Sequence, residues 1–409
     1  MLSESPVMAQ ATFLWQLKQW PRFNVQEAAL RSALSSARQE QGKVMGLARA
    51  IGMADFAHVA QDIWVDEALA TAAIEGEKLD LAAVRSSVLR RLGLPGGGPL
   101  PASRSVDGLL DVMQDAMATA GTALDDDRLW RWQGALFPAG TSGIHRIAVG
   151  RYRDSQEPMQ VVSGPIGRET LHYEAPSAAV VPQEMRRFLD WFNGSKPHAG
   201  ATASVDGIVR AALCHLWFES VHPFDDGNGR IGRAIVDMAL AQDDGSSQRL
   251  YGMSRQLMRE REAYYSQLEQ AQRGSLDVTP WVQWFLDQFR LACVASQQVI
   301  EQAVDKSRFW KEHAATAINK RQRKALLKML EAGNGGFAGG MSASKYGSVT
   351  RTSKATATRD LAELERNGLL TTSGQGRSTR YWVNIPEWKI ALSKRPTTRA
   401  AGGMNDRQD

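Results

Sequence analysis

Residues 221–233 read VHPFDDGNGRIGR, and this stretch sets the arrangement of the helices around it. The proline after His222 disfavours helical backbone at His222, so the strongly apolar helix predicted over 205–220 ends there. Gly227 lies in a glycine-rich segment that permits a tight turn. A second helix is predicted over 230–242. The free N–H groups at its start, together with its dipole, would form an anion site at the turn.

The charged residues of this stretch suit a nucleotide. Arg230 and Arg233 are three residues apart and share one helix face, so two guanidinium groups over the helix start would match a polyphosphate. Asp226 adds a carboxylate of the kind that holds one Mg²⁺ bridging phosphates. His222 is the nearby group able to take a proton near neutral pH. Together these residues describe transfer from a nucleotide to a hydroxyl, although each residue alone also fits an ordinary structural role.

The stretch resembles the signature of the Fic family, His-Pro-Phe-x-Asp/Glu-Gly-Asn-Gly-Arg-x-x-Arg, and every signature position is filled. With nine fixed positions, a chance match at background residue usage is on the order of one in 10⁹. The resemblance extends over residues 12–300. It includes FLWQLKQWPRF at 13–23, which resembles the small N-terminal domain of one Fic subgroup. It also includes GRYR at 150–153 and MQVVSGPIG at 159–167, which resemble the family's approach to its substrate flap.

The resemblance implies a protein adenylyltransferase, which moves AMP from ATP to Ser, Thr or Tyr hydroxyls of target proteins. By match, His222 is the general base and Asp226 holds Mg²⁺. The flap residues Val161, Val162, Ser163 and Gly164 would align a target backbone by strand addition. The implied ATP contacts are Gly227, Asn228 and Gly229 near the α-phosphate, Arg230 and Arg233 at the β- and γ-phosphates, and Tyr265 and Gln272 near the nucleoside. Many relatives have Asn at the position of Gln272.

A second motif lies upstream, in sequence predicted to be helical over 66–80. Residues 71–76 read TAAIEG, which resembles the family's inhibitory motif Ser/Thr-x-x-x-Glu-Gly/Asn through Thr71, Glu75 and Gly76. The resemblance implies that Glu75 pairs with Arg233 and removes the cation meant for the γ-phosphate, which turns ATP away from the attack geometry. Glu75 could also position a water for the reverse removal of AMP. The alternative is an ordinary exposed glutamate on an alanine-rich helix.

The chain is predicted to be mostly α-helical, with a Fic-type helical bundle, a β-hairpin flap and a C-terminal winged helix-turn-helix domain. Glycine and proline dominate the start of GLPGGGPLPASR at 93–104, which favours a linker. The predicted organisation is an N-terminal helical domain with the inhibitory helix over 1–92, the linker over 93–104, the Fic domain over 105–300, a connecting helix over 301–319, the winged-helix domain over 320–390 and a disordered tail over 391–409.

The charge of the chain is unevenly distributed. Residues 306–400 carry 19 Lys and Arg against 6 Asp and Glu, whereas residues 1–305 carry a net charge of −7. A basic C-terminal module on an acidic body points to duplex DNA as the partner of that module. The alternative is a protein-interaction or dimerisation module, because helical spacing and a basic face fit both. The residues predicted to face phosphates or the major groove are Lys354, Thr356, Arg359, Arg377 and Arg380.

Cysteine usage and hydropathy bound the class of protein further. Cys214 and Cys293 are the only cysteines, which excludes a disulfide scaffold and a cysteine-based zinc site and fits a reducing cytoplasm. Each lies in an apolar helical pattern, so both are expected to be core residues. No apolar run approaches the length of a membrane span, and the N-terminus shows no secretory signal. These features predict a cytoplasmic protein without a membrane partner.

Two classes of function follow from these patterns. The leading hypothesis is AMP transfer to a hydroxyl-bearing protein target, with ATP as substrate, Mg²⁺ as cofactor, and self-modification and a homodimer left open. The alternative is a DNA-binding transcriptional regulator that uses the Fic fold as a nucleotide sensor. The intact His222 speaks against the sensor, because sensing a nucleotide needs no base.

Overall fold

The structure is a computed structural model that describes residues 13–50, 53–94, 104–164, 168, 170–197, 205–246, 250–333, 337, 339–386 and 388. The chain divides into two compact units, Met1–Ile300 and Glu301–Asp409. Within the described residues the fold is mostly helical with small antiparallel hairpins, which confirms the predicted fold class at that level. Most of the predicted linker, residues 95–103, and the predicted tail over 391–409 lie outside the described residues.

The elements of the first unit are, in chain order, η1 (Leu14–Gln16), α1 (Glu27–Ala50), α2 (Met53–Ile74), α3 (Leu81–Arg91), α4 (Arg104–Ala118), α5 (Asp126–Leu136), β1 (Thr141–Ser142), β2 (His145–Arg146), β3 (Gln160–Ser163), β4 (Thr170–Glu174), η2 (Ala178–Val180), α6 (Val181–Gly194), α7 (Gly207–Val221), α8 (Asn228–Asp244), α9 (Met253–Arg259) and α10 (Arg261–Arg273). The long helix α11 (Thr279–Glu312) begins in this unit and continues past its boundary. A separate connecting helix over 301–319 is therefore wrong. No proline or glycine interrupts the helical sequence near residue 300.

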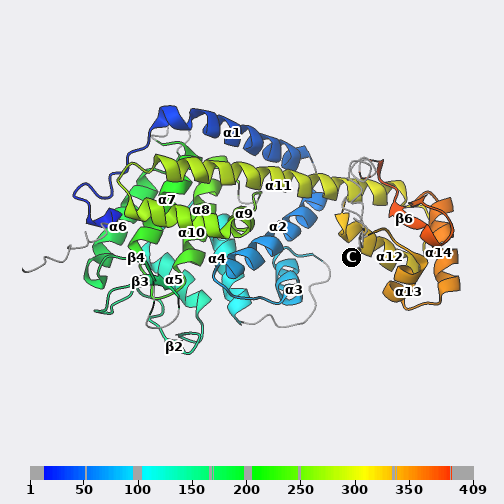
Figure 1. Ribbon diagram of the computed structural model, residues 1–409, viewed down its shortest axis with the longest axis horizontal. Coiled ribbons are helices and arrows are strands. Elements are labelled where there is room, and N and C mark those ends of the chain that lie inside the picture. The colour runs from blue at the N-terminus through cyan, green and yellow to red at the C-terminus, as the bar shows by residue number, and fades with distance from the viewer. Residues whose placement is uncertain are drawn as a thin grey trace, which may run out of the picture. The chain divides into compact units, whose positions relative to one another are not determined.

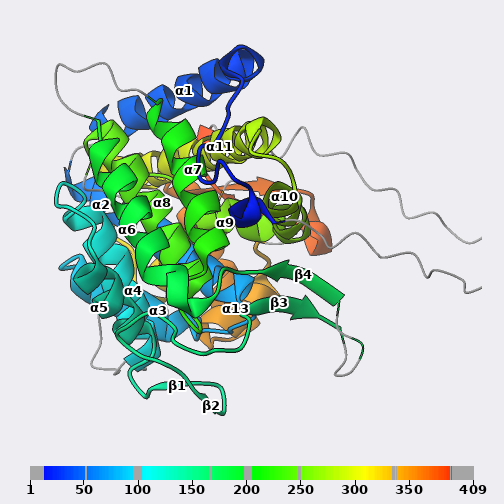
Figure 2. The same cartoon turned by 90° about the vertical axis from the view of Figure 1, so that its left-hand side faces the viewer.

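The core of the first unit is built around α7, all of whose residues are buried. Its sequence is predominantly apolar on every face, which suits a helix surrounded by other helices. α7 packs against α8, α6 and α10, while α4 and α5 contact α8. Figures 1 and 2 show α7 and α8 side by side among these helices. The turn that carries the motif is thereby anchored at both ends by buried helices.

The β3–β4 hairpin projects to one side of the helices (Figure 2). Its strands are antiparallel, with Val161 opposite Tyr173 and an irregular register between Val161 and Val162. The Tyr173 ring packs edge-on against Phe13, and its hydroxyl donates to the Ser220 carbonyl of α7. Val161 and Val162 are 39% and 48% exposed. One strand therefore attaches the hairpin to the body, while the other leaves apolar side chains in solvent.

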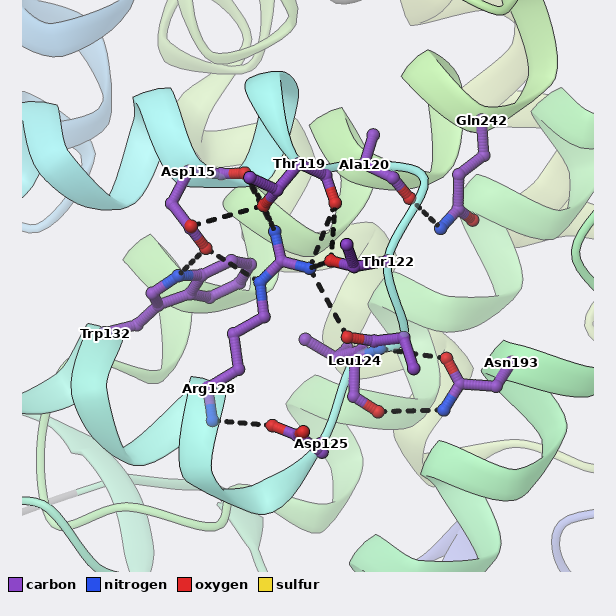
Figure 3. Close-up of polar contacts among 11 residues, drawn as sticks. Asp115, Thr119, Ala120, Thr122, Leu124, Asp125, Arg128, Trp132, Asn193 and Gln242 are labelled. Atoms are coloured by element: carbon purple, nitrogen blue, oxygen red, sulfur yellow. Dashed lines mark hydrogen bonds and ion pairs between the residues drawn. The ribbon is translucent and has the colours of Figure 1, made fainter.

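A buried arginine organises the connection between α4 and α5 (Figure 3). The Arg128 side chain is 3% exposed and donates to the Asp115 carboxylate at 2.7 Å and to the Asp115 carbonyl at 2.8 Å. It also donates to the Thr122 hydroxyl at 2.9 Å. Trp132 donates its indole N–H to the same Asp115 carboxylate at 2.7 Å. These bonds tie α5 to the last turn of α4 and the loop after it, and the last residue of α5, Leu136, lines a cavity at the site.

The helix expected over 66–80 is wrong in its last part, because α2 ends at Ile74. Gly76 has a φ of 79°, a left-handed conformation in which glycine commonly ends a helix. Asp80 instead begins the next helix, and its carboxylate accepts a hydrogen bond from the Ala83 N–H at 2.7 Å. The chain therefore turns between α2 and α3 rather than continuing as one helix.

The second unit contains the basic C-terminal segment. Its described elements after α11 are α12 (Lys320–Glu331), α13 (Ala343–Thr350), α14 (Lys354–Arg366), β5 (Leu370–Ser373), η4 (Gly376–Ser378) and β6 (Arg380–Val383). β5 and β6 pair antiparallel, and Met341 forms an isolated bridge to Tyr381 of β6. Buried apolar side chains from the three helices and the hairpin form a core of this unit. The helices α12 and α14 thus lie inside the segment 320–390 that was predicted to be a separate domain.

Cys214 and Cys293 are fully buried free thiols, as predicted for core residues. Burial raises the pKa of Cys214 to about 12, so this thiol stays protonated at neutral pH. In the part of the chain that the structure describes, none of the helices combines the length and the hydropathy needed to cross a membrane.

Candidate active site

The motif turn between α7 and α8 is held in place by a buried arginine. His222 ends α7 with a left-handed φ of 50°. Arg153 donates from Nε to the His222 carbonyl at 2.8 Å, and its backbone N–H donates to the Pro223 carbonyl at 2.9 Å. Gly227 has a φ of 92°, and a Cβ at this position would lie 2.9 Å from the Phe137 ring. The turn therefore requires glycine on grounds of both backbone conformation and space.

The Asn228 side chain stabilises the turn by two hydrogen bonds to its backbone. Its amide donates to the Phe224 carbonyl at 2.8 Å and accepts from the Phe224 N–H at 2.9 Å. The residue is buried, so a ligand would contact it only through its backbone. The predicted α-phosphate contacts of Gly227, Asn228 and Gly229 are therefore backbone N–H groups, as in a helix N-terminal anion site, although the Gly227 N–H donates to the Asp226 carboxylate.

His222 lies at the edge of a cavity with 17% of its side chain exposed. Burial, and then the positive charge of Arg153, lowers the pKa of His222 to about 4, although a hydrogen bond with the Glu219 backbone opposes the shift. The imidazole is therefore neutral at pH 7 and able to accept a proton. The carboxylate Oε2 of Glu219 lies 3.9 Å from Nδ1 of His222.

Glu219 and His215 are buried polar residues of α7 that the sequence reasoning did not single out. Burial, with repulsion by Glu75, raises the pKa of Glu219 to about 8. Burial lowers the pKa of His215 to about 3, and its Nε2 lies 2.8 Å from the Tyr264 hydroxyl. The signal was available, because an acid and a histidine in an otherwise apolar helix are rarely buried without a partner or a task.

Arg233 of α8 is bound by the end of α2. Its side chain is 4% exposed and donates from Nη2 to Glu75 Oε1 at 2.7 Å. It also donates from Nε to the Thr71 hydroxyl at 2.7 Å and from Nη2 to the Thr71 carbonyl at 3.0 Å. Burial disfavours the charged guanidinium, but attraction to Glu75 outweighs this and raises the pKa of Arg233 above its usual range. Glu75 Oε1 occupies the space that a side chain at Gly229 would take.

Arg230 and Asp226 lie together near the end of α5. The Arg230 guanidinium lies 4.9 Å from the Phe137 ring centroid and 3.5 Å from Asp226 Oδ1. The Asp226 side chain is 37% exposed, and its other oxygen accepts a hydrogen bond from Ser142. Among the described side chains, no group of three His, Cys, Asp or Glu could hold a metal. Asp226 therefore offers a single carboxylate, which suits a Mg²⁺ whose other ligands are phosphate oxygens and water.

Two cavities of about 800 Å³ each border the motif and share Glu75 as a lining residue. Asp226, Arg230 and the β1–β2 segment line the first cavity. His222 and Gly229 line the second, together with the flap strands and α10. Glu75 thus lines both the cavity of Arg230 and the cavity of His222.

Four of the residues predicted at the nucleoside and at the flap, Val161, Val162, Tyr265 and Gln272, line the cavity of His222. Tyr265 is 40% exposed, and its hydroxyl donates to the Ile74 carbonyl at the end of α2 at 3.0 Å. Gln272 is buried at the same cavity, which the exposed Val161 and Val162 also line. Ser163 ends β3, with its side chain outside the described residues, and the exposed Gly164 follows with a φ of 105°. Residues 165–167 and 169 also lie outside the described part.

The residues predicted to contact DNA all fall in the second unit. Lys354 and Arg359 are exposed on α14, while Thr356 lies in the first turn of that helix and is partly buried. Arg380 begins β6 and is partly buried. Arg377 belongs to η4, and its side chain lies outside the described residues.

Residues 123–240 match the sequence profile of the Fic/DOC family, and residues 13–94 match a domain of unknown function, DUF4172. The chain therefore contains a Fic/DOC family domain, as the motif predicted. The matched domain includes the α7–α8 turn, Arg153 and the flap, whereas Glu75 lies in the DUF4172 region.

Curated relatives with similar sequences carry names of nucleotide transferases. A probable protein adenylyltransferase of Aquifex aeolicus (strain VF5) is 30% identical over 106 residues, which cover 26% of this chain and 28% of that protein. The protein adenylyltransferase Fic of Nematostella vectensis is 26% identical over 216 residues, 52% of this chain and 44% of that protein. A uridine 5'-monophosphate transferase of Xanthomonas campestris pv. campestris (strain 8004) is 30% identical over 123 residues, 30% of this chain and 22% of that protein. The chain thus spans less than half the length of each of these relatives.

Solved structures of Fic proteins resemble this chain at low sequence identity. A Fic family protein of Desulfovibrio desulfuricans G20 has a TM-score of 0.48 and 20% identity, covering 86% of this chain and 95% of that one. A Fic domain containing signaling protein of Bacteroides thetaiotaomicron VPI-5482 has a TM-score of 0.48 and 18% identity, covering 65% of this chain and 97% of that one.

Proposed function

We propose that this protein is an adenylyltransferase that moves AMP from ATP to a hydroxyl of a protein target. The observation that carries the proposal is the neutral imidazole of His222 at the edge of a cavity, directly before a helix start that bears Arg230 and Arg233. The names of the relatives from Aquifex aeolicus and Nematostella vectensis support the same activity.

The reaction forms one phosphorus–oxygen bond and breaks another. The target hydroxyl oxygen attacks the α-phosphorus of ATP, its proton passes to His222, and pyrophosphate leaves as the bond to the β-phosphate breaks. The N–H groups at the start of α8 would stabilise negative charge that develops on the α-phosphate. Arg230 and Arg233 would hold the departing pyrophosphate by charge-assisted hydrogen bonds. Arg153 keeps His222 in place through the turn's carbonyls.

Asp226 would hold Mg²⁺ at the phosphates. When bound, the ion neutralises charge on the triphosphate and on the pyrophosphate that leaves. Ser142 restricts the Asp226 carboxylate by donating a hydrogen bond to one of its oxygens. Arg230, 3.5 Å from the other oxygen, holds the same carboxylate at the cavity that both residues line.

We propose adenine as the base of the nucleotide and expect the nucleoside to bind in the cavity that Tyr265 and Gln272 line. The matched Xanthomonas campestris relative is named a uridine 5'-monophosphate transferase, so uracil is the alternative base. Parallel reactions with α-labelled ATP and UTP decide between them. Label from UTP but not from ATP would replace adenine by uracil as the assigned base and leave the proposed transfer chemistry intact.

The protein is further proposed to inhibit itself. Arg233 is the cation meant for the γ-phosphate, and three of its hydrogen bonds are made with Glu75 and Thr71. A triphosphate that cannot reach Arg233 is not held with its α-phosphate in line for attack. Glu75 also fills the space beside Gly229, where the α-phosphate region would lie. In the reverse reaction, the same carboxylate would position a water that removes AMP from the target.

The test of the proposed function is transfer of label to protein. The Glu75→Gly variant is incubated with Mg²⁺ and ATP labelled on the α-phosphate, and label is expected on the variant itself and on target proteins. ATP labelled on the γ-phosphate should leave no label, because pyrophosphate departs. His222→Ala in the same background should abolish transfer while ATP affinity stays within a few-fold. Transfer above about one hundredth of the parent rate would overturn the general-base role, since such bases contribute roughly 10²–10⁴-fold.

For the second unit we propose binding to duplex DNA. Lys354 and Arg359 are exposed on α14, as phosphate contacts require. The order α12, Met341 bridge, α13, α14, β5 and β6 supports the predicted winged helix, with α14 as the recognition helix. A protein-interaction module remains the competing proposal, and salt-dependent retardation of duplex DNA by the full chain distinguishes the two.

A further inference from the structure

We infer that Glu77 is a second inhibitory residue of the nucleotide site, which binds Arg230 and thereby withholds the guanidinium assigned to the β-phosphate. The inference rests on the proposed function, because it concerns the same phosphate site. It is carried by an ion pair separate from that of Glu75: Glu77 Oε2 lies 3.2 Å from Arg230 Nη1.

Glu77 reaches Arg230 because of the way in which α2 ends. The Glu77 N–H donates to the Ala72 carbonyl at 3.0 Å. The Gly76 N–H donates to the Ala73 carbonyl, also at 3.0 Å. These are the two hydrogen bonds of a Schellman motif, which reverses the chain at a left-handed glycine. The two glutamates on either side of Gly76 are therefore directed to different arginines of α8.

The Arg230 guanidinium is largely shielded from water, and nearby carboxylates balance its positive charge. Its side chain is 10% exposed, lies over the Phe137 ring, and has a buried Nε without a hydrogen-bond partner. Glu77, at 3.2 Å, is closer to the guanidinium than Asp226, at 3.5 Å. A phosphate would bind through the same N–H groups, so it must compete with Glu77 for them.

Glu77 and Glu75 face different parts of the site. Of the two cavities that border the motif, Glu77 lines the one with Arg230 and Asp226, whereas Glu75 lines both. Within the first cavity, three carboxylates would repel a polyphosphate. Removing the charge of Glu77 should therefore strengthen phosphate binding without changing contacts of the nucleoside. Glu75, in contrast, controls both the γ-phosphate and the attack geometry.

The test is equilibrium binding in the full chain carrying His222→Ala, which prevents self-modification during the measurement. Glu77→Gln keeps the size of the side chain and removes its charge. The expected result is a two- to fivefold lower Kd for Mg²⁺-ATP, a modest change because Glu77 is 38% exposed. The Kd for adenosine should not change, since adenosine has no phosphate. The gain for ATP should shrink as salt increases.

Glu331→Gln is the matched control. It removes the same charge from a 52%-exposed glutamate paired with Lys328 at 2.9 Å in the second unit, so the ATP Kd should not change. Glu77→Gln should still lower the ATP Kd when Glu75→Gly is also present, because Glu77 acts on a different arginine. An unchanged ATP Kd in a variant with the parent melting temperature would overturn the inference, as would an equal gain for adenosine. Absence of ATP binding even with Glu75→Gly would instead overturn the proposed function.

Discussion

Replacing Glu75 with glycine should convert a weakly active transferase into a much more active one. The ion pair that is removed is short and largely shielded from water: its N–O distance is 2.7 Å, Arg233 is 4% exposed and Glu75 is 31% exposed. Hydrogen bonds to charged groups contribute roughly 1.5–3 kcal/mol. Because each 1.36 kcal/mol changes a rate about tenfold, the expected gain is about ten- to a hundredfold. Thr71 keeps its two bonds to Arg233, so the freed guanidinium remains oriented for a phosphate.

The assay measures the initial rate of AMP transfer from α-labelled ATP, with self-modification followed on the same gels. Glu75→Gln serves as a graded variant, because its amide oxygen still accepts from Arg233 but carries no charge, so its gain should be smaller. Asp111→Asn is the control for charge alone, since it removes a 63%-exposed carboxylate that pairs with Arg91. Its rate should equal that of the wild type. Melting temperatures establish that each variant is folded.

The double variant decides whether the inhibition works through Arg233. Glu75→Gly combined with Arg233→Ala should lose the gain, because the glutamate inhibits by occupying that cation. If Glu75→Gly leaves the rate unchanged, or if it activates equally when Arg233 is absent, this account of regulation is refuted even though the Fic/DOC domain stands.

Three further predictions concern pH and the second unit. Because the pKa of His222 is lowered to about 4, the Glu75→Gly variant should keep the neutral base between pH 8 and pH 5.5, and a rate loss centred near pH 6.5 would contradict this. The pKa of Glu219 is raised from 4.5 to about 8, so between these pH values the folded protein keeps a proton on Glu219 that the unfolded chain has released. The free energy of unfolding of the wild type should therefore fall as the pH rises from 4.5 to 8. Glu219→Gln removes this dependence. In thermal melts from pH 5 to 9, the melting temperature of the variant relative to the wild type should therefore rise with pH and then become constant. The full chain should retard duplex DNA at low salt with a steep loss at moderate salt, and Arg359→Ala should weaken retardation; no retardation at low salt would favour an interaction module.

Local backbone chemistry made the motif turn predictable from the sequence. A proline disfavours helical backbone at the residue before it, and a glycine permits a left-handed turn, wherever they occur in a chain. The end of α7 and the start of α8 were therefore predicted to within two residues. The identity of the motif residues also indicated a Fic domain, and residues 123–240 match the Fic/DOC family profile.

Only the tertiary structure decided which side chains meet. Glu75 and Arg233 are 158 positions apart, and their expected pairing followed from a family resemblance rather than from the residues themselves. Glu77 and Glu219 were overlooked because the sequence around a glutamate does not show whether its side chain faces solvent or a buried cation. The end of α2 was placed too late for a related reason, since residues 75–80 include good helix formers. Their chain reversal is stabilised by contacts with α8 that a local pattern does not contain, because such contacts join residues that only the folded chain brings together.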